Sequence, residues 1–171
     1  MDAANNPAKT HVLIVRFIDA QDVVSRLINW MTNSLWCHTE AFNPEGGEHG
    51  GWIGAHAGTG VQDRPFSWCM PTRERVYAVP VTAEQYEKAW TFLNAKVGTP
   101  YDYGDIVGLS LHNRRFGRGK KRIICSALMV EFLMAAGLQP LNVIEGFEYL
   151  ITPETLHLSP LFIGRCVKSV G

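Results

Sequence analysis

The stretch RIICSALMVEFLMAAG, residues 122–137, decides the fold and also holds the strongest candidate for chemistry. Its apolar residues recur at helical spacing, and Gly137 follows them as a helix terminator. The positions that carry this pattern are Ala127, Leu128, Val130, Leu133 and Met134. The pattern predicts an amphipathic helix of about three turns, with Cys125 at or near its N-cap.

A cysteine at the start of a helix is well suited to nucleophilic chemistry. A thiol attacks as its thiolate, and the unpaired N–H groups and positive dipole end of a helix favour that anion. Cys125 is therefore a candidate nucleophile. The alternative is structural, because free cysteines are among the most buried residue types and pack as small hydrophobes.

Length and charge limit the possible classes of protein. A chain of 171 residues is long enough for one domain with a full hydrophobic core, so we expect a flexible N-terminus (1–10) and a single domain (11–171). Basic and acidic residues balance at 16 each, so no overall charge recruits nucleic acid or an anionic membrane. One basic cluster fits either a solvated loop or an anion site. It consists of Arg114, Arg115, Arg118, Lys120, Lys121 and Arg122.

Cysteine usage and the N-terminus bear on location. The four cysteines, at positions 37, 69, 125 and 166, include no CxxC pair and are expected to be reduced. The start MDAANNPAKT has no signal-peptide pattern, and no stretch approaches the length of a membrane-spanning helix. We expect a protein that is cytoplasmic where it is synthesised, with lysis or a phage as its route to a cell wall.

Strand and helix patterns alternate along the chain. Strands are predicted at 11–17, 35–42, 52–57, 75–81 and 161–167, and the second and third of these form a hairpin. Helices are predicted at 19–31 and 82–97, where Thr82 and Gln85 fit a capping box, and in a short piece through Leu109. The fold class is α+β: a mainly antiparallel sheet or partial barrel packed with helices.

His38 and Glu40 lie two residues apart in the predicted strand 35–42, so their side chains share one face. A carboxylate beside an imidazole can fix its tautomer and stabilise the imidazolium. A structural zinc site is the competing hypothesis, with Cys37, His38, His49, His56 and Cys69 as the available ligands. Adjacent Cys37 and His38 point to opposite faces of a strand, and the remaining spacings match no zinc motif.

Several motifs occur in a recognisable order. They are WCHTE (36–40), GAHAGTGVQDRP (54–65), GTPYDYGDIVGL (98–109), ICSALMVEFLMAAG (124–137) and ITPETLHLSP (151–160). In this order the chain resembles the circularly permuted papain-like cysteine hydrolases of the NlpC type, in their small phage and bacterial branch. The resemblance covers residues 10–162 and implies a permuted papain-like domain that needs no cofactor and no metal.

The resemblance also implies roles for individual residues. Cys125 would be the nucleophile, and His38 the general base and then acid. Glu40 would orient His38, with His56 as its rival for that third role. The substrate cleft would include Tyr101, Asp102, Tyr103 and Ser126, although the sequence PYDY is also ordinary turn chemistry. Trp36, Trp52 and Trp68 fit either a groove or the core, and the core is the usual place for strand aromatics.

The expected function is that of a thiol hydrolase, a cysteine peptidase or amidase that cleaves an amide or ester through an acyl-enzyme. Peptidoglycan peptides are its candidate substrates. The alternatives are a related acyltransferase or lipid-ester thiol enzyme, and a catalytically silent binding module. We expect a peptide or acyl partner and no nucleic acid.

Overall fold

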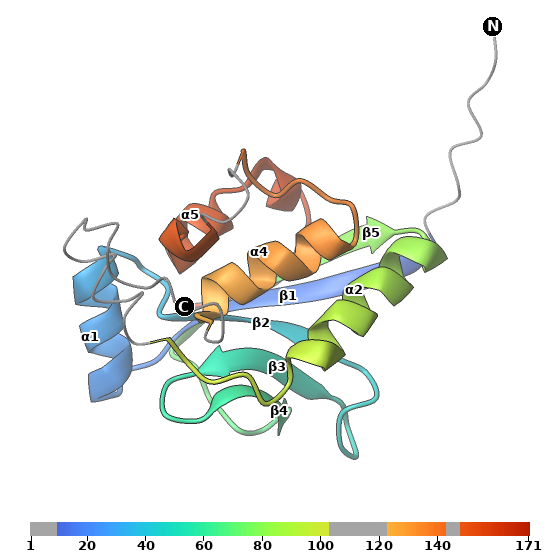
Figure 1. Ribbon diagram of the computed structural model, residues 1–171. Helices are drawn as coiled ribbons and strands as arrows, with labels where there is room; N and C mark the ends of the chain where they lie inside the picture. Colours follow the sequence, from blue (N-terminus) through green and yellow to red (C-terminus); the bar gives the residue numbers. More distant parts are fainter. Residues whose placement is uncertain (1–9, 103–122, 143–147) are drawn as a thin grey trace, which may run out of the picture.

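The computed structural model describes residues 10–102, 123–142 and 148–171, and within them the chain is α+β (Figure 1). Six strands form one sheet in the order β4-β3-β2-β1-β5-β6, and all neighbouring strands are antiparallel. The predicted α+β class and antiparallel sheet are therefore confirmed. The N-terminus predicted to be flexible lies outside the described residues, apart from Thr10.

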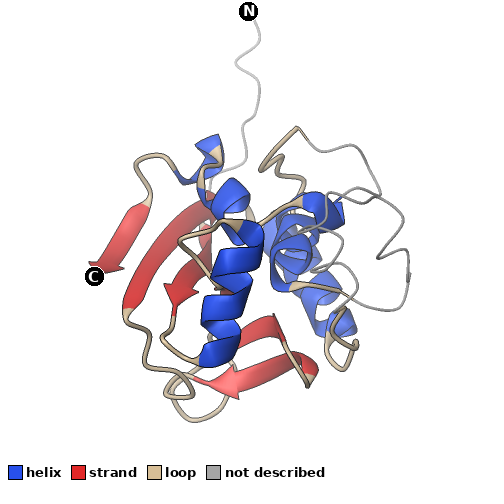
Figure 2. Ribbon diagram, turned by 90° about the vertical axis from the view of Figure 1, so that its left-hand side faces the viewer, coloured by secondary structure: helices blue, strands red, loops and turns tan. Residues whose placement is uncertain are grey.

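The sheet is formed by β1 (His11–Asp19), β2 (His38–Asn43), β3 (Gly51–His56), β4 (Gly60–Pro65), β5 (Arg73–Val81) and β6 (Cys166–Val170). The helices are α1 (Val23–Thr32), α2 (Ala83–Lys96), α4 (Cys125–Ala135) and α5 (Pro153–His157). Two short 3-10 turns, η1 (Glu148–Leu150) and η2 (Pro160–Phe162), flank α5. Helices and strands form separate layers (Figure 2).

Several element boundaries differ from the sequence prediction. Strand β4 was not predicted as a strand, because its sequence GVQDRP is polar; it pairs with β3 along its whole length. Strand β6 begins at Cys166 rather than Leu161, because Ser159 caps the turn η2 just before it. Helix α1 begins at Val23, where the Asp22 carboxylate accepts the Ser25 N–H. The predicted short helix ending at Leu109 and the basic cluster lie outside the described residues.

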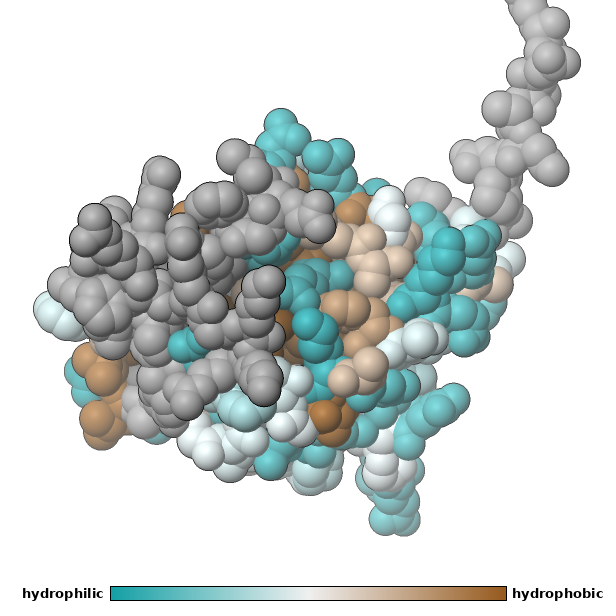
Figure 3. All heavy atoms as spheres, in the orientation of Figure 1, coloured by the Kyte–Doolittle hydropathy of each residue, from teal (hydrophilic) through white to brown (hydrophobic). Residues whose placement is uncertain are grey.

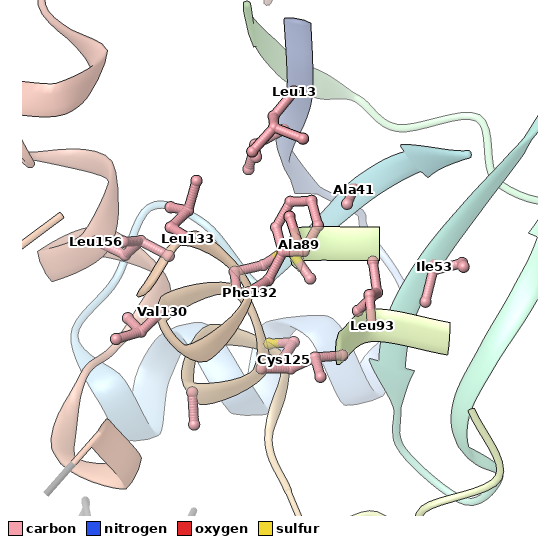
Figure 4. Packing of buried hydrophobic residues seen from close by; sticks show 14 of the residues in the cluster. Leu13, Ala41, Ile53, Ala89, Leu93, Cys125, Val130, Phe132, Leu133 and Leu156 are labelled. Atoms are coloured by element: carbon pink, nitrogen blue, oxygen red, sulfur yellow. The ribbon is translucent and has the colours of Figure 1, made fainter. Parts of the chain in front are cut away.

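Both faces of the central strand β1 are buried. Leu13, Val15 and Phe17 are fully buried and join the apolar core that α2 and α4 cover (Figure 4). The intervening Arg16 is only 2% exposed, and it lies on the other face of the sheet. That second face holds a buried polar cluster rather than hydrocarbon.

Local chemistry sets the ends of the two long helices. The predicted capping box is confirmed, because the Thr82 side chain accepts the Gln85 N–H while the Gln85 side chain accepts the Thr82 N–H. Gly137, with φ at +71°, follows the C-cap Ala136 of α4, as predicted. No helix in the described parts of the chain is long and apolar enough to cross a membrane.

Candidate functional site

Cys125 is the first residue of α4, directly after its N-cap Ile124. The Ile124 side chain makes no capping hydrogen bond, and the first intrahelical bond runs from the Leu128 N–H to the Ile124 carbonyl at 3.0 Å. The backbone N–H groups of the first turn, including that of Cys125, therefore have no acceptor within the helix. The thiol is 4% exposed and borders the apolar cluster (Figure 4).

His38 stands at the first position of β2 and links two partners. Its ring lies close enough to the Cys125 side chain for the two groups to interact electrostatically. Its Nε2 atom lies 3.1 Å from Glu40 Oε1, as expected for two residues on one strand face. Cys125, His38 and Glu40 thus come together between α4 and β2, although 87 residues separate the first two in the chain.

Glu40 is fully buried, and its two oxygens have different partners. Oε2 accepts the Arg16 Nε–H at 2.7 Å, while Oε1 faces His38 at 3.1 Å and His56 Nε2 at 3.5 Å. Burial alone would raise the pKa of this carboxyl, but the neighbouring His38, Arg16 and His56 lower it to about 2. Glu40 is therefore a carboxylate throughout the physiological pH range.

The two histidines beside Glu40 have opposite pKa shifts. Burial would lower the pKa of His38, but the Cys125 and Glu40 charges and its hydrogen bonds to both raise it to about 9. Burial lowers the pKa of His56 to about 3, with His38 as the next cause, and Arg64 and Arg16 add to the effect. His38 is thus the histidine that carries a proton at neutral pH, beside the Glu40 carboxylate.

His56, the predicted rival for the third role, is close to His38 but is not bonded to it. It ends β3, is 5% exposed, and its ring centroid lies 4.7 Å from that of His38. Its Nε2 atom makes no hydrogen bond, and the Trp68 ring packs edge-on against it with centroids 4.8 Å apart. Glu40, and not His56, therefore makes the hydrogen-bonding contact with His38 that an orienting residue requires.

Two residues of this cluster were not identified from the sequence. A Cβ atom on Gly54 would lie 2.9 Å from both Glu40 Cγ and His38 Nε2, so only glycine lets β3 approach these side chains. Arg16, on β1, donates a hydrogen bond to Glu40. It belongs to the run HVLIVRF, which was predicted to be a buried apolar strand. A lone arginine in such a run was the available signal, because a buried cation requires a partner.

A cleft of about 310 Å³ opens beside His38 and His56. Of the predicted cleft residues, Tyr101 lines it, and Asp102 is buried next to Tyr101. Tyr103 lies outside the described residues. Ser126 is not among the described lining residues, because it is fully buried and its hydroxyl donates to the Ile151 carbonyl.

The three tryptophans considered for a groove are divided between the interior and the cleft. Trp68 lines the cleft, whereas Trp36 and Trp52 are each 3% exposed. Trp36 belongs to the apolar core, as predicted, although it lies before β2 rather than in it. The Arg16 guanidinium stacks over the Trp52 ring at 3.9 Å.

One group of possible metal ligands is present in the described parts of the chain. His38, Glu40 and His56 each offer one ligand atom, and these atoms lie within 4.8 Å of one another. This set differs from the cysteine and histidine set weighed from the sequence. The Cys37 thiol instead donates to the Ile18 carbonyl at 3.3 Å.

Comparisons with known proteins give a likeness in structure rather than in sequence. No family model matches the chain, and no curated protein matches it. Among solved structures, the chain is similar to the metalloprotein yiiX from Escherichia coli O157:H7, described as DUF1105. The TM-score is 0.64 and the identity 14%, over 96% of this chain and 98% of that one. At this identity the likeness shows a shared fold alone.

These findings correct the family assignment made from motif order. Assignment to the NlpC-type cysteine hydrolases is wrong, because the structural match points to a differently described family and no family model matches. The motifs behind it are short and have local structural roles of their own, such as the β-bridge that Tyr101 forms with Ile123. The permuted papain-like description of the fold is not confirmed, and the shared feature is an α+β fold with an antiparallel sheet.

Proposed function

We propose that the protein is a thiol hydrolase that cleaves an amide or ester through an acyl-enzyme. The observation that carries the proposal is the convergence of Cys125, His38 and Glu40, with His38 lining an open cleft. A nucleophile, a base and an orienting group in contact are the parts that covalent acyl transfer requires. Cell-wall peptides and simple esters are the first substrates to assay.

In the first step, the Cys125 thiolate attacks the substrate carbonyl carbon, and the His38 imidazolium then protonates the departing amine or alcohol. Breaking the C–N or C–O bond leaves a thioester on Cys125. The backbone N–H of Cys125 lies at the uncapped start of α4, where it can donate to the oxyanion of the tetrahedral intermediate. Glu40 keeps His38 oriented and favours its charged form.

In the second step, neutral His38 takes a proton from water while the water oxygen attacks the thioester. The C–S bond breaks, the carboxylic acid leaves, and the proton held by His38 restores the ion pair with the Cys125 thiolate. An alcohol or amine in place of water would turn the same chemistry into acyl transfer.

One surface feature favours a lipid-borne acyl donor or acceptor. Helix α1 lines the cleft with Ser25 and Ile28, while Val23, Leu27 and Trp30 are 83%, 52% and 80% exposed. Apolar side chains gather at the lower left of the molecule, over α1 (Figure 3). Exposed apolar patches commonly mark contact surfaces. Faster turnover of long-chain than of short-chain acyl esters, abolished in Trp30→Ser, would favour acyl transfer to or from lipids.

The test of the hydrolase proposal is an acyl-enzyme trapped at one residue. The protein is mixed with p-nitrophenyl acetate, quenched in acid and digested, and the adduct is located by mass spectrometry. We expect a mass increase on Cys125 and turnover that Cys125→Ala removes. Cys166→Ala is the matched control, because Cys166 is an exposed free thiol outside the cluster. Acylation of all four cysteines alike would overturn the proposal.

A metal centre is a second candidate function, favoured by the His38, Glu40 and His56 cluster and by the description of the structural neighbour as a metalloprotein. Zinc bonds of about 2.0–2.1 Å place tetrahedral ligand atoms about 3.3 Å apart. Glu40 Oε1 lies 3.1 Å from His38 Nε2 and 3.5 Å from His56 Nε2, and His56 Nε2 lacks a hydrogen bond. These two distances match such an ion, and all three ligand atoms lie within 4.8 Å of one another; a bound ion would supply a Lewis acid to the cleft.

Calorimetric titration with Zn²⁺ separates the two candidates. A metal centre requires one bound ion per chain, with an affinity that His56→Ala lowers about 10-fold or more. His49→Ala is the matched control, because His49 is exposed in the loop before β3. Turnover that persists in EDTA identifies the hydrolase, whereas turnover lost in EDTA and restored by Zn²⁺ identifies the metal centre.

A further inference from the structure

Arg64 lines the cleft, and three neighbouring side chains hold its guanidinium in place. It lies on the same face of β4 as Gln62, whose side-chain oxygen accepts the Arg64 Nε–H at 3.2 Å. Thr59, in the turn before β4, accepts a hydrogen bond from Nη2 at 2.9 Å. The Trp68 ring packs against the guanidinium, with Cζ 4.6 Å from the ring centroid. Two hydrogen bonds and a stacked ring together fix the plane of this cation.

Arg64 has no acidic partner in the described parts of the chain. No carboxylate there lies within ion-pair distance of it, and its third nitrogen, Nη1, donates to no acceptor. Asp22 also lines the cleft, but its two oxygens accept the backbone N–H and the hydroxyl of Ser25 at the start of α1. The Nη1 end of Arg64 is therefore a charged donor that a carboxylate in the cleft would match.

Trp68 connects this cation to the candidate catalytic residues. Strand β4 ends at Pro65, and a turn in which the Trp68 N–H donates to the Pro65 carbonyl at 2.9 Å brings the indole back beside the strand. The indole packs edge-on against His56, with centroids 4.8 Å apart, and against His38, with centroids 6.4 Å apart. The same ring therefore lies against Arg64 and against both histidines of the site.

The order of the strands indicates which half of a substrate would meet Arg64. From β2 to the edge strand β4, the sheet presents His38, then His56, then Arg64 (Figure 1). Cys125 approaches His38 from the other direction, at the start of α4. In the proposed reaction the acyl group joins Cys125, and the leaving group takes its proton from His38. The leaving group therefore extends along the cleft toward Arg64.

We infer that Arg64 is a specificity-determining residue that binds a carboxylate on the leaving group of the substrate. The preferred substrates are then acylated amino acids, acylated hydroxy acids and peptides cleaved before their C-terminal residue. This inference rests on the proposed thiol hydrolase. Hydrolysis breaks the C–N or C–O bond, the departing amine or alcohol takes its proton from His38, and the carboxylate paired with Arg64 leaves unchanged.

The experiment compares two esters in EDTA, para-acetoxybenzoate and para-acetoxybenzamide, which differ only in a carboxylate against a neutral amide on the leaving group. Both esters meet the same Cys125 and His38, so the ratio of their kcat/KM values cancels changes in the reacting groups. We expect the wild type to prefer the carboxylate about 10-fold or more, and Arg64→Met to lose about 10-fold of that preference. Arg64→Lys should keep part of it, and Arg64→Glu should favour the amide.

The matched control is Arg26→Met, because Arg26 is exposed on α1 and is not among the described residues that line the cleft. It should keep the wild-type preference. The same preference in Arg64→Met as in the wild type would overturn the inference. A wild type that does not prefer the carboxylate would also overturn it, and that result requires no variant to fold. A preference confined to the acyl side, for mono-p-nitrophenyl adipate over p-nitrophenyl hexanoate, would overturn the assignment to the leaving group.

Binding of the leaving group alone separates this inference from the proposed function. The ¹⁵N NMR signal of the Trp68 indole N–H reports binding of para-hydroxybenzoate, with para-hydroxybenzamide as its neutral partner, and no acyl-enzyme is needed. Binding of para-hydroxybenzoate that Arg64→Met weakens, in a protein that never forms an acyl-enzyme, would leave the carboxylate site in place and remove the hydrolase. Acyl-enzyme formation without any preference for the carboxylate would do the reverse.

Discussion

The start of β2 and the end of β3 each place a histidine beside the same oxygen of Glu40, yet the pKa values of the two rings shift in opposite directions. The pKa of His38 is raised to about 9 and that of His56 is lowered to about 3. Burial disfavours the charged form of both, so burial does not separate them. What differs is the remaining partner: the Cys125 thiol at His38, and the two arginines at His56. Charged neighbours, rather than depth of burial, give the two rings their opposite pKa shifts.

Removing the thiol should have the largest effect on this comparison. In Cys125→Ala, His38 loses the first of the interactions that raise its pKa, so its ring should titrate well below 9. Turnover should fall by about 10³-fold or more, because the nucleophile is gone. Ester hydrolysis and ¹⁵N NMR of the rings measure the two effects, and full turnover in this variant would remove the nucleophile assignment.

Replacing the Glu40 carboxylate with an amide should have the second-largest effect. Glu40→Gln removes the carboxylate from both histidines and leaves Arg16 with Glu74 alone, so we expect a loss of about 3–5 kcal/mol in the free energy of unfolding. Turnover per folded molecule should fall by about 10²-fold or more, since the imidazole loses its orienting partner. Urea unfolding gives the folded fraction used to correct the rate.

The same assay on His56→Ala tests the choice of Glu40 as the orienting residue. His56 makes no hydrogen bond to His38, so we expect a loss of turnover of at most about 10-fold. A larger loss in His56→Ala than in Glu40→Gln would make His56 the third member of the site.

A methyl group at Gly54 should disturb the side chains of Glu40 and His38 at once. The added Cβ would overlap Glu40 Cγ and His38 Nε2, so Gly54→Ala should cost about 1–3 kcal/mol in stability and slow Cys125 alkylation. Gly51→Ala is the matched control on the same strand, because its Cβ would meet Asp63 instead. Equal alkylation rates in the two variants would show that the tight approach of β3 does not position the site.

The sequence was informative where the chemistry is local. A period of two put His38 and Glu40 on one face, and helical periodicity placed Cys125 at a helix start; both features are found. These inferences need only the geometry of one element. The same reasoning failed for the family, since the order of short motifs carried the assignment.

The rest of the cluster depends on pairing between distant strands. Arg16 meets Glu74, 58 residues later, only because β1 and β5 are neighbours in the sheet. The need for glycine at position 54 comes from the approach of β3 to side chains of β2. Neither requirement leaves a periodic pattern in the sequence, and a single buried arginine in an apolar run was the one visible sign of the network.

The smallest expected effect is the pH dependence of stability, and here the two histidines should have opposite signs. The folded chain binds more protons than the unfolded chain at His38 between pH 6.5 and about 9, so this contribution to stability is lost as the pH rises through that window. At His56 the unfolded chain binds more protons between pH 6.5 and about 3, so stability is lost as the pH falls.

Each group can change the free energy of unfolding by at most about 1.4 kcal/mol per pH unit. Urea unfolding at pH 5, 6.5 and 8.5 should therefore give a maximum near pH 6.5, with the alkaline slope reduced in His38→Gln and the acid slope reduced in His56→Gln. Equal slopes in all three proteins would mean that Glu40 does not distinguish the two rings.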